Sequence, residues 1–393
     1  MKNNDTPAAL TLLLGALISL SALGTDLYVP ALPDVAAAYS APVSAAQFTL
    51  TTYFLGLAAG QLIWGPLSDR YGRRPVLLAA LGLMLVVTAA APFMPSIGAL
   101  IAARLVQGLG MSGGVVVARS IVRDLHAHEQ AARLLARMMI VFSIVPIAAP
   151  VSGALLTAHG GWRAIFWTFA AIALALLVAV AAGLRETVPA ERRSAHPVDI
   201  ARALARILVE PRFHRPLLLF LCCQMGILAW VASSAFTLAR MGVSINAYGW
   251  MFAAVMLGQI VGAWVASRFV LRVGMARLVR SGSGLVLAGG LAAAALAWGG
   301  AEHWLAVVLP FALLLFGTAL VIPSATALAL SPFPQAAGAA SSLIGAIGFT
   351  AGAGLSALLG VLFDGTARPM ASAAALAGIA AFLFERRLAR GTR

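Results

Sequence analysis

Residues 65–75 read GPLSDRYGRRP and lie between two apolar stretches, each long enough to cross a lipid bilayer. Glycines and prolines at these positions predict a tight turn at the membrane surface. Asp69 is a single acid among Arg70, Arg73 and Arg74, so we expect it to make a directed contact. A solvated surface turn would explain the arginines, but not the acid between two glycines.

Apolar stretches of about 20 residues recur along the whole chain, as crossing a membrane requires. Only 10% of the 393 residues are charged, whereas a soluble domain carries about 25%. The pattern predicts an all-α membrane protein with about twelve transmembrane helices. We expect them near residues 8–31, 46–66, 75–93, 97–119, 132–157, 163–184, 216–238, 248–267, 278–298, 304–328, 335–362 and 369–385.

The net charge of +14 follows the predicted topology. Arginine-rich segments alternate with nearly uncharged loops, and they are residues 70–74, 119–137, 185–215, 268–280 and 386–393. Only Arg163, Arg240 and Arg368 fall in loops of the other side. Because loops rich in arginine and lysine stay in the cytoplasm, this pattern predicts that both termini are cytoplasmic. The charge is therefore a topology signal, and we expect no nucleic-acid partner.

The longest polar segment, residues 185–215, divides the chain into two parts. We predict a six-helix bundle over residues 1–184, a cytoplasmic linker, and a second six-helix bundle with a short tail over residues 216–393. A short repeat supports a duplication, because GQLIWG at 60–65 and GQIVG at 258–262 occupy the second helix of each part. Duplicated halves with pseudo-symmetry are typical of secondary transporters.

Asp26 and Arg104 are the two ionisable residues placed well inside apolar segments. A charge at membrane depth costs a few kcal/mol, and it is normally kept for proton, ion or substrate handling. Asp26 lies about 27 Å along its predicted helix, and Arg104 about 10 Å from the opposite start of its own. The similar depth predicts that the two residues pair and couple proton movement to transport. The alternative is a static buried ion pair.

The 65–74 segment resembles the signature G-x-x-x-D-R-x-G-R-R of the major facilitator superfamily. Five further segments are similar to its Bcr/CflA group of drug:proton antiporters, namely TDLYVPALP at 25–33, RLVQGLG at 104–110, ARSIVRD at 118–124, GWRAIF at 161–166, and SPFP with AGAASS between 331 and 342. This resemblance implies a major facilitator fold in the bacterial inner membrane. It also implies export of amphipathic drugs, chloramphenicol- or bicyclomycin-like, in exchange for protons.

The resemblance further implies a gate. In the superfamily the signature acid lies near the start of the eleventh helix, here near Pro334 and Gln335, and a signature arginine pairs with an acid ending the fourth helix. That suggests Asp69 against this helix start and Arg73 with Asp124. The residues expected to form the gate are Gly65, Asp69, Arg70, Gly72, Arg73, Arg74 and Asp124.

One segment departs from the group. Residues 149–154 read APVSGA where the antiporters have G-P-x-x-G-G, although Pro146, Pro150 and Gly153 are still expected to bend the helix. The change leaves open a superfamily carrier for a metabolite such as an amino acid or a sugar.

Drug sites are mostly apolar with a few polar anchors. The side chains that we expect to contact a drug are Tyr28, Tyr53, Met111, Met139, Phe142 and Trp230, with ordinary packing as the alternative for each. The expected partners are a small-molecule drug, protons and the lipid bilayer, and we expect the protein to act as a monomer.

Other chemistries are not indicated. The G-x-G-x-x-G at 108–113 lies inside a predicted membrane helix, so close helix packing explains it better than dinucleotide binding. No G-x-x-x-x-G-K-[ST] motif occurs, so ATP is not expected to drive the protein. Cys222 and Cys223 are adjacent, which disfavours a disulfide. We expect no metal, no cofactor and no enzymatic activity.

Overall fold

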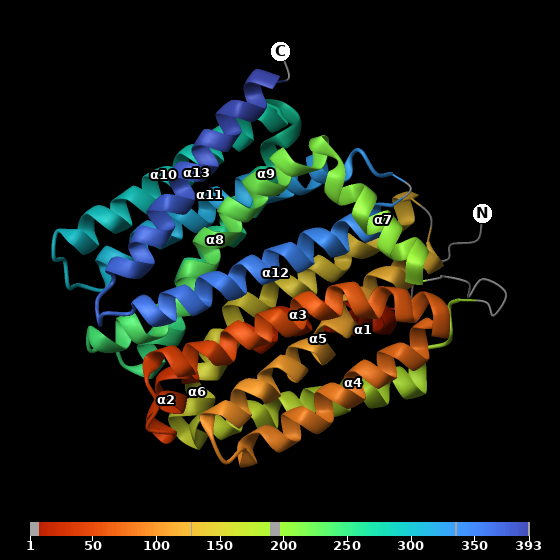
Figure 1. Cartoon of the computed structure of the whole chain (residues 1–393), viewed down its shortest axis with the longest axis horizontal. Helices are drawn as coiled ribbons and strands as arrows, with labels where there is room; N and C mark the ends of the chain where they lie inside the picture. Colours follow the sequence, from red (N-terminus) through yellow and green to blue (C-terminus); the bar gives the residue numbers. More distant parts are fainter. Residues whose placement is uncertain (1–7, 127, 189–196, 335, 392–393) are drawn as a thin grey trace.

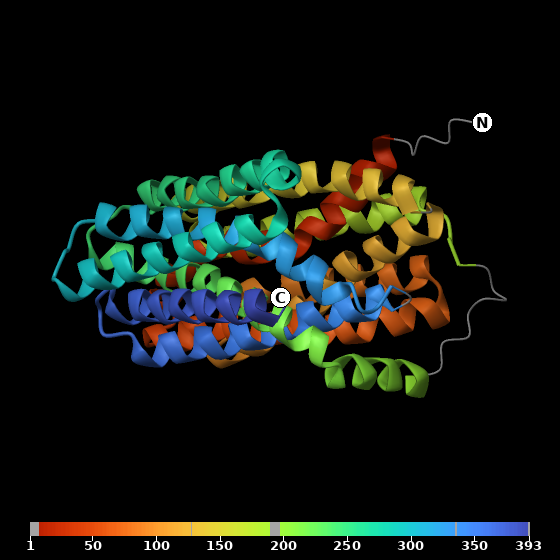
Figure 2. The same ribbon diagram turned by 90° about the horizontal axis from the view of Figure 1, so that it is seen from above.

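The computed structural model describes residues 8–126, 128–188, 197–334 and 336–391, and within these ranges it contains helices and no strands. Long helices run side by side along one direction and are joined by short turns at both ends (Figure 1 and Figure 2). The first part of the chain forms α1 (Ala8–Asp26), η1 (Val29–Ala31), α2 (Leu32–Ala38), α3 (Val43–Tyr71), α4 (Arg73–Ala90), η2 (Ala91–Phe93), α5 (Ile97–Leu125) and α6 (His128–Gly183). The second part forms α7 (Pro197–Val209), α8 (Pro211–Arg240), α9 (Ile245–Val273), α10 (Met275–Trp298), α11 (Leu305–Leu330), α12 (Ala337–Leu362) and α13 (Arg368–Gly391).

Nine stretches of the described residues are long and apolar enough to cross a membrane. The longest belongs to α6, which is interrupted at Gly161 by a backbone with φ +67° and therefore crosses twice. Two more helices of similar length, α3 and α13, pack beside these stretches. The predicted all-α architecture of about twelve crossings is confirmed.

The first crossing differs from the continuous helix predicted over residues 8–31. Helix α1 ends at Asp26, and the chain continues through η1 into α2 as far as Ala38. Pro30 and Pro33 explain the change, because proline has no N–H with which to continue a helical ladder. The break leaves Asp26 at a helix end.

The polar segment 185–215 is not a plain linker, because it contains α7. One face of α7 is apolar and its residue Ile207 is fully buried, together with Phe213 of α8, Ala329 of α11 and Leu343 of α12. Helix α7 therefore packs against the second half of the chain, where Figure 1 shows it beside α12. Residues 189–196 of this segment, including Pro189, lie outside the described residues.

Glycines let the membrane helices approach closely. A Cβ atom on Gly108 would overlap the backbone carbonyl of Tyr53 in α3, and one on Gly110 would lie 2.9 Å from the backbone nitrogen of Met84 in α4. Small residues are common where membrane helices touch. The G-x-G-x-x-G of α5 is therefore a packing motif, as predicted.

The two halves of the chain meet along two pairs of helices, α3 with α12 and α6 with α9. Figure 1 shows α12 lying beside α3 over most of its length. Across this contact, the rings of Phe54 and Phe349 stack with centroids 6.2 Å apart. The site described below lies close to these contacts.

Candidate functional site

Asp26 is the last residue of α1 and is only 7% exposed. No hydrogen bond or ion pair reaches its carboxylate from any residue that the structure describes. It lies within electrostatic reach of two tyrosine hydroxyls, on Tyr53 of α3 and Tyr248 of α9. A buried, unpaired carboxylate at a helix break is a group that can take up and release a proton.

Arg104 is fully buried in α5, and its side chain contacts the backbone at the end of α1. Its Nη2 donates to the carbonyl oxygen of Gly24 at 3.0 Å. Its Nη1 donates to Oε1 of Gln107 at 2.5 Å, and Gln107 in turn donates to Thr88 at 3.0 Å. The last carbonyls of a helix need outside partners, and Arg104 supplies one to α1. The predicted pairing of Asp26 with Arg104 is therefore wrong in this conformation, because the guanidinium binds the helix end instead.

Two aromatic rings enclose the Arg104 guanidinium. Its carbon lies 4.1 Å from the ring centre of Tyr28 and 4.2 Å from that of Tyr53, within the range of cation–π attraction. The Tyr53 hydroxyl donates to the carbonyl of Ser21 at 2.9 Å and lies 3.1 Å from the sulfur of Met111. The structure thus brings together three of the six residues predicted to contact a drug.

The other three predicted drug contacts lie elsewhere. Met139 and Phe142 are on α6, the first 42% exposed and the second half-buried. Trp230 is fully buried in α8, where its ring lies 5.7 Å from Phe252 and 5.4 Å from Phe311. Sequence alone did not separate these environments, since all three residues occur in equally apolar segments.

Residues 65–75 lie at one end of the molecule, and we call these residues the signature end. Helix α3 runs through Pro66 as far as Tyr71, so the turn is shorter than predicted. It consists of Gly72 alone, whose φ of +100° favours glycine. Arg73 is buried, and its Nε lies 2.8 Å from Oδ2 of Asp124, which confirms the predicted ion pair.

Arg73 holds further partners. Its Nη1 donates to Oγ of Ser68 at 2.7 Å and also to the carboxylate of Asp69. No hydrogen bond or ion pair joins Asp69 to α12 within the described residues, although Gln335 lies outside them. The side chain beside the start of α12 is Arg123, whose guanidinium would overlap a Cβ atom on Gly338. The predicted contact of Asp69 with this helix start is thus not formed here.

The remaining residues of the predicted gate have ordinary surroundings. Arg70 lies over the ring of Tyr71 at 5.4 Å, and Arg74 donates to the carbonyl of Ala181 at 2.7 Å. A Cβ atom on Gly65 would make only van der Waals contact with Val116.

Glu186, which we did not single out from the sequence, caps the start of α4. Its carboxylate accepts from the backbone nitrogens of Arg73 at 2.9 Å and Arg74 at 3.2 Å, and from those of Thr187 and Val188. Burial alone would raise the pKa of Glu186, but these backbone donors hold it below the usual range. The signal available in the sequence was an isolated acid just after an apolar span.

The bending of α6 expected at Pro146 and Pro150 stays a prediction. The helical assignment continues through both prolines, and the non-helical residue, Gly161, separates the two helices predicted at 132–157 and 163–184. Gly153 has a different use, because a Cβ atom there would overlap the carbonyl of Leu27, next to Asp26. Ala154, an alanine where the antiporters have glycine, packs against Gly249 of α9. The missing glycine of α6 is therefore matched by a glycine on its partner.

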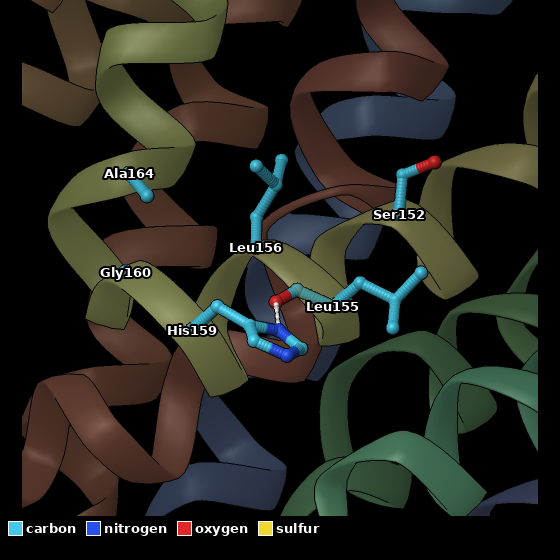
Figure 3. Close-up of a pocket in the computed structure, with 6 residues that line it drawn as sticks. All are labelled: Ser152, Leu155, Leu156, His159, Gly160 and Ala164. Carbon is cyan, nitrogen blue, oxygen red and sulfur yellow. Dashed lines mark hydrogen bonds between the residues drawn. The ribbon is translucent and has the colours of Figure 1, made fainter.

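A cavity of about 580 Å³ lies along α6, next to the break at Gly161. Figure 3 shows the side chains that line it, which are Ser152, Leu155, Leu156, His159, Gly160 and Ala164. The His159 ring contacts the carbonyl of Leu155 through Nδ1 at 2.9 Å. None of the six predicted drug contacts lines this cavity.

With this geometry in view, the comparisons with known proteins identify the class. The sequence profile of the Major Facilitator Superfamily matches residues 14–357, and the chain belongs to this family of transporters. It is a multi-pass membrane protein and, like its relatives, a transporter and not an enzyme.

The relatives narrow the comparison. The chain is 30% identical to "Multidrug resistance protein D" of Escherichia coli (strain K12), covering 89% of each chain. It is also 30% identical to a "Chloramphenicol resistance protein" of Pseudomonas aeruginosa, over 87% of this chain and 81% of the relative. The fold is similar to the crystal structure of the POT family transporter PepTSo, with a TM-score of 0.75, 16% identity and coverage of 98% and 99%.

Proposed function

We propose that this protein exports amphipathic drugs across the bacterial inner membrane in exchange for protons. The relatives named for multidrug and chloramphenicol resistance support this substrate class. The bundles of residues 1–184 and 216–393 would rock about a central site, joined by the segment 185–215, with both termini in the cytoplasm. The transporter would act as a monomer.

The observation that carries the proposal is the state of Asp26. It is buried at a helix break, without an ion pair or hydrogen bond from the described residues. An ion pair would hold the carboxylate permanently charged, whereas an unpaired group in a poorly solvated place can exist in either form. Membrane transporters place coupling sites at such discontinuous helices.

The other site residues then have distinct tasks. Arg104 fixes the broken end of α1 through the Gly24 carbonyl and so sets where Asp26 lies. Tyr28, Tyr53 and Met111 surround the same place and would contact the drug. The ion pair of Arg73 with Asp124 would hold the signature end in one conformation. Gly153 would let α6 slide past Leu27.

The driving force suffices for drug resistance. One elementary charge moving through 100 mV releases about 2.3 kcal/mol. One proton per cycle could therefore sustain roughly a 40- to 50-fold gradient of a neutral drug per 100 mV.

Transport by the purified protein in proteoliposomes with an imposed pH gradient tests the proposal. We expect the gradient to drive chloramphenicol or a bicyclomycin-like drug, and Asp26→Asn to remove the dependence on it. Drug transport by the wild type at the same rate with and without the gradient would refute proton antiport. If no drug moves but an amino acid or sugar does, the protein is a metabolite carrier.

A further inference from the structure

The second half of the chain approaches Asp26 through a short series of close contacts. The 3-10 helix η1, which follows the break after Asp26, packs against α8 and α9. Gly153 of α6 lies against the carbonyl of Leu27, the residue next to Asp26. One turn along, α6 meets α9, where a Cβ atom on Gly249 would lie 2.9 Å from the carbonyl of Pro150. Residue 248 of α9 is thereby held close to the break.

That residue is a tyrosine with a fixed orientation. Tyr248 is 4% exposed, and its hydroxyl lies 2.9 Å from Oγ of the fully buried Ser234 on α8. Its ring packs edge-on against Phe252, with centroids 6.0 Å apart. The hydroxyl lies within electrostatic reach of the Asp26 carboxylate across the boundary between the two halves, and no hydrogen bond joins the two groups in this conformation.

We propose that Tyr248, oriented by Ser234, is the residue through which the second half of the transporter senses the charge on Asp26. It is a positioning residue for proton coupling, and the inference rests on the proposed function. A phenol hydroxyl donates a strong, charge-assisted hydrogen bond to an ionised carboxylate. To the protonated carboxyl group it donates a weaker hydrogen bond or none. Ionisation of Asp26 would therefore favour a hydrogen bond from Tyr248 that is not formed in this conformation and would hold the halves together at this end, and protonation would disfavour it.

The surroundings of Asp26 offer few competing groups. The titratable and charged side chains near it are Tyr28 beside it, Tyr53 from α3, Arg104 from α5 and Tyr248 from α9. The facing stretches of α6 (residues 146–157) and α8 (226–238) contain no titratable side chain. Tyr248 of α9 is thus the titratable group that the second half presents to Asp26 among the helices named here.

The test is the pH dependence of proton release when drug binds to the purified, detergent-solubilised protein. Tyr248→Phe keeps the ring against Phe252 and removes the hydroxyl. Because the ionised form of Asp26 can then no longer gain this donor, we expect the midpoint of proton release to move up by about one pH unit. Drug affinity at a pH where Asp26 is fully ionised or fully protonated in both proteins should change less than about twofold.

Tyr39→Phe is the matched control, since the Tyr39 hydroxyl donates to the carbonyl of Met94 at 2.9 Å, away from Asp26. Its midpoint should match that of the wild type. Ser234→Ala retains the phenol but frees it, so a smaller shift in the same direction is expected, and it replaces Tyr248→Phe if that variant does not fold. Combining Tyr248→Phe with Asp26→Asn should add nothing to Asp26→Asn alone.

Two failures are distinguishable. If Asp26→Asn releases protons like the wild type, the proposed proton site is wrong and this inference falls with it. If Asp26→Asn abolishes release but Tyr248→Phe and Ser234→Ala leave the midpoint unchanged, Asp26 is the proton site and Tyr248 only packs.

Discussion

The α3–α5 pair in the first half of the chain and the α9–α11 pair in the second pack alike. Gly56 of α3 lies against the carbonyl of Leu105 in α5, and Gly258 of α9 lies against the carbonyl of Ala312 in α11. The residues that precede these carbonyls therefore occupy equivalent places. They are Arg104 in the first half and Phe311 in the second.

The two equivalent positions hold different kinds of side chain, one charged and one aromatic. Arg104 is hydrogen-bonded to the broken end of α1 and enclosed by two tyrosine rings. Phe311 is fully buried and packs on Trp230, with ring centroids 5.4 Å apart. Equal helix packing thus supports a charged centre in one half and an aromatic centre in the other. We infer that proton handling is concentrated in the first half, and the following experiments test that division.

The largest effect is expected from Asp26→Asn. Asparagine keeps the size of the side chain but cannot ionise, so efflux driven by a pH gradient should fall to the rate seen without a gradient. The measurement is drug transport into proteoliposomes with and without the gradient. Asp34→Asn is the control, because Asp34 is exposed in α2 and its loss should leave transport unchanged. Equal coupling in Asp26→Asn and wild type would remove the basis for a charged first half.

Arg104→Gln should have the next largest effect. It removes the donor to the Gly24 carbonyl, and an unpaired buried carbonyl costs about 1–3 kcal/mol. We expect thermal unfolding in detergent at a lower temperature, and transport slower by about 5- to 150-fold if the break must keep its shape.

Phe311→Leu is the counterpart of Arg104→Gln in the second half. It should lower stability by about 1 kcal/mol while the pH dependence of transport stays that of the wild type. A shifted pH profile in Phe311→Leu would show that the aromatic centre also takes part in coupling.

Gly56→Leu and Gly258→Leu probe the packing that the halves share. Each inserts a side chain where a Cβ atom would already overlap a backbone carbonyl, so each should destabilise its half by about 1–3 kcal/mol. Differential scanning calorimetry of the purified variants measures this loss of stability. Gly354→Ala should be neutral or slightly stabilising, because nothing lies within 4 Å of its Cβ position. Tolerance of one leucine but not the other would break the equivalence of the two pairs.

Asp69→Asn should act more weakly, because Asp69 is a half-exposed partner of Arg73 and exposed ion pairs contribute about 0–1 kcal/mol. The balance between conformations should shift by up to about fivefold. Spin labels near residues 71 and 337 measure the distance between the end of α3 and the start of α12, which differs between the conformations. An unchanged distance distribution would mean that the signature acid does not gate.

Glu186→Gln should have the smallest effect. The pKa of Glu186 is depressed by backbone donors at the start of α4, so its contribution is present above pH about 4 and is lost as the pH falls further. Since the side chain is partly exposed, we expect a loss below about 1 kcal/mol at neutral pH. The difference in unfolding temperature between variant and wild type should shrink as the pH falls below about 4. A constant difference across pH would assign it to side-chain shape.

Sequence reasoning was reliable where the apolar pattern or the resemblance to a family indicated the answer. The number of crossings, the packing role of the α5 glycines and the Arg73–Asp124 ion pair were all predicted. It was wrong for the pairing of Asp26 with Arg104, which rested on depth alone. Depth along two helices placed Asp26 and Arg104 at one level, but depth does not say which atoms an arginine reaches.

The apolar period, the charge distribution and the signature segment by themselves determined that this chain is a membrane transporter of the major facilitator type. They suffice because a bilayer permits few architectures, and each crossing must satisfy its own backbone. Only the tertiary structure decided that α1 breaks at Asp26, that Arg104 caps the break, and that Tyr248 of the distant α9 lies near it. Those features depend on which helix faces meet, and that is decided by close packing summed over the whole molecule.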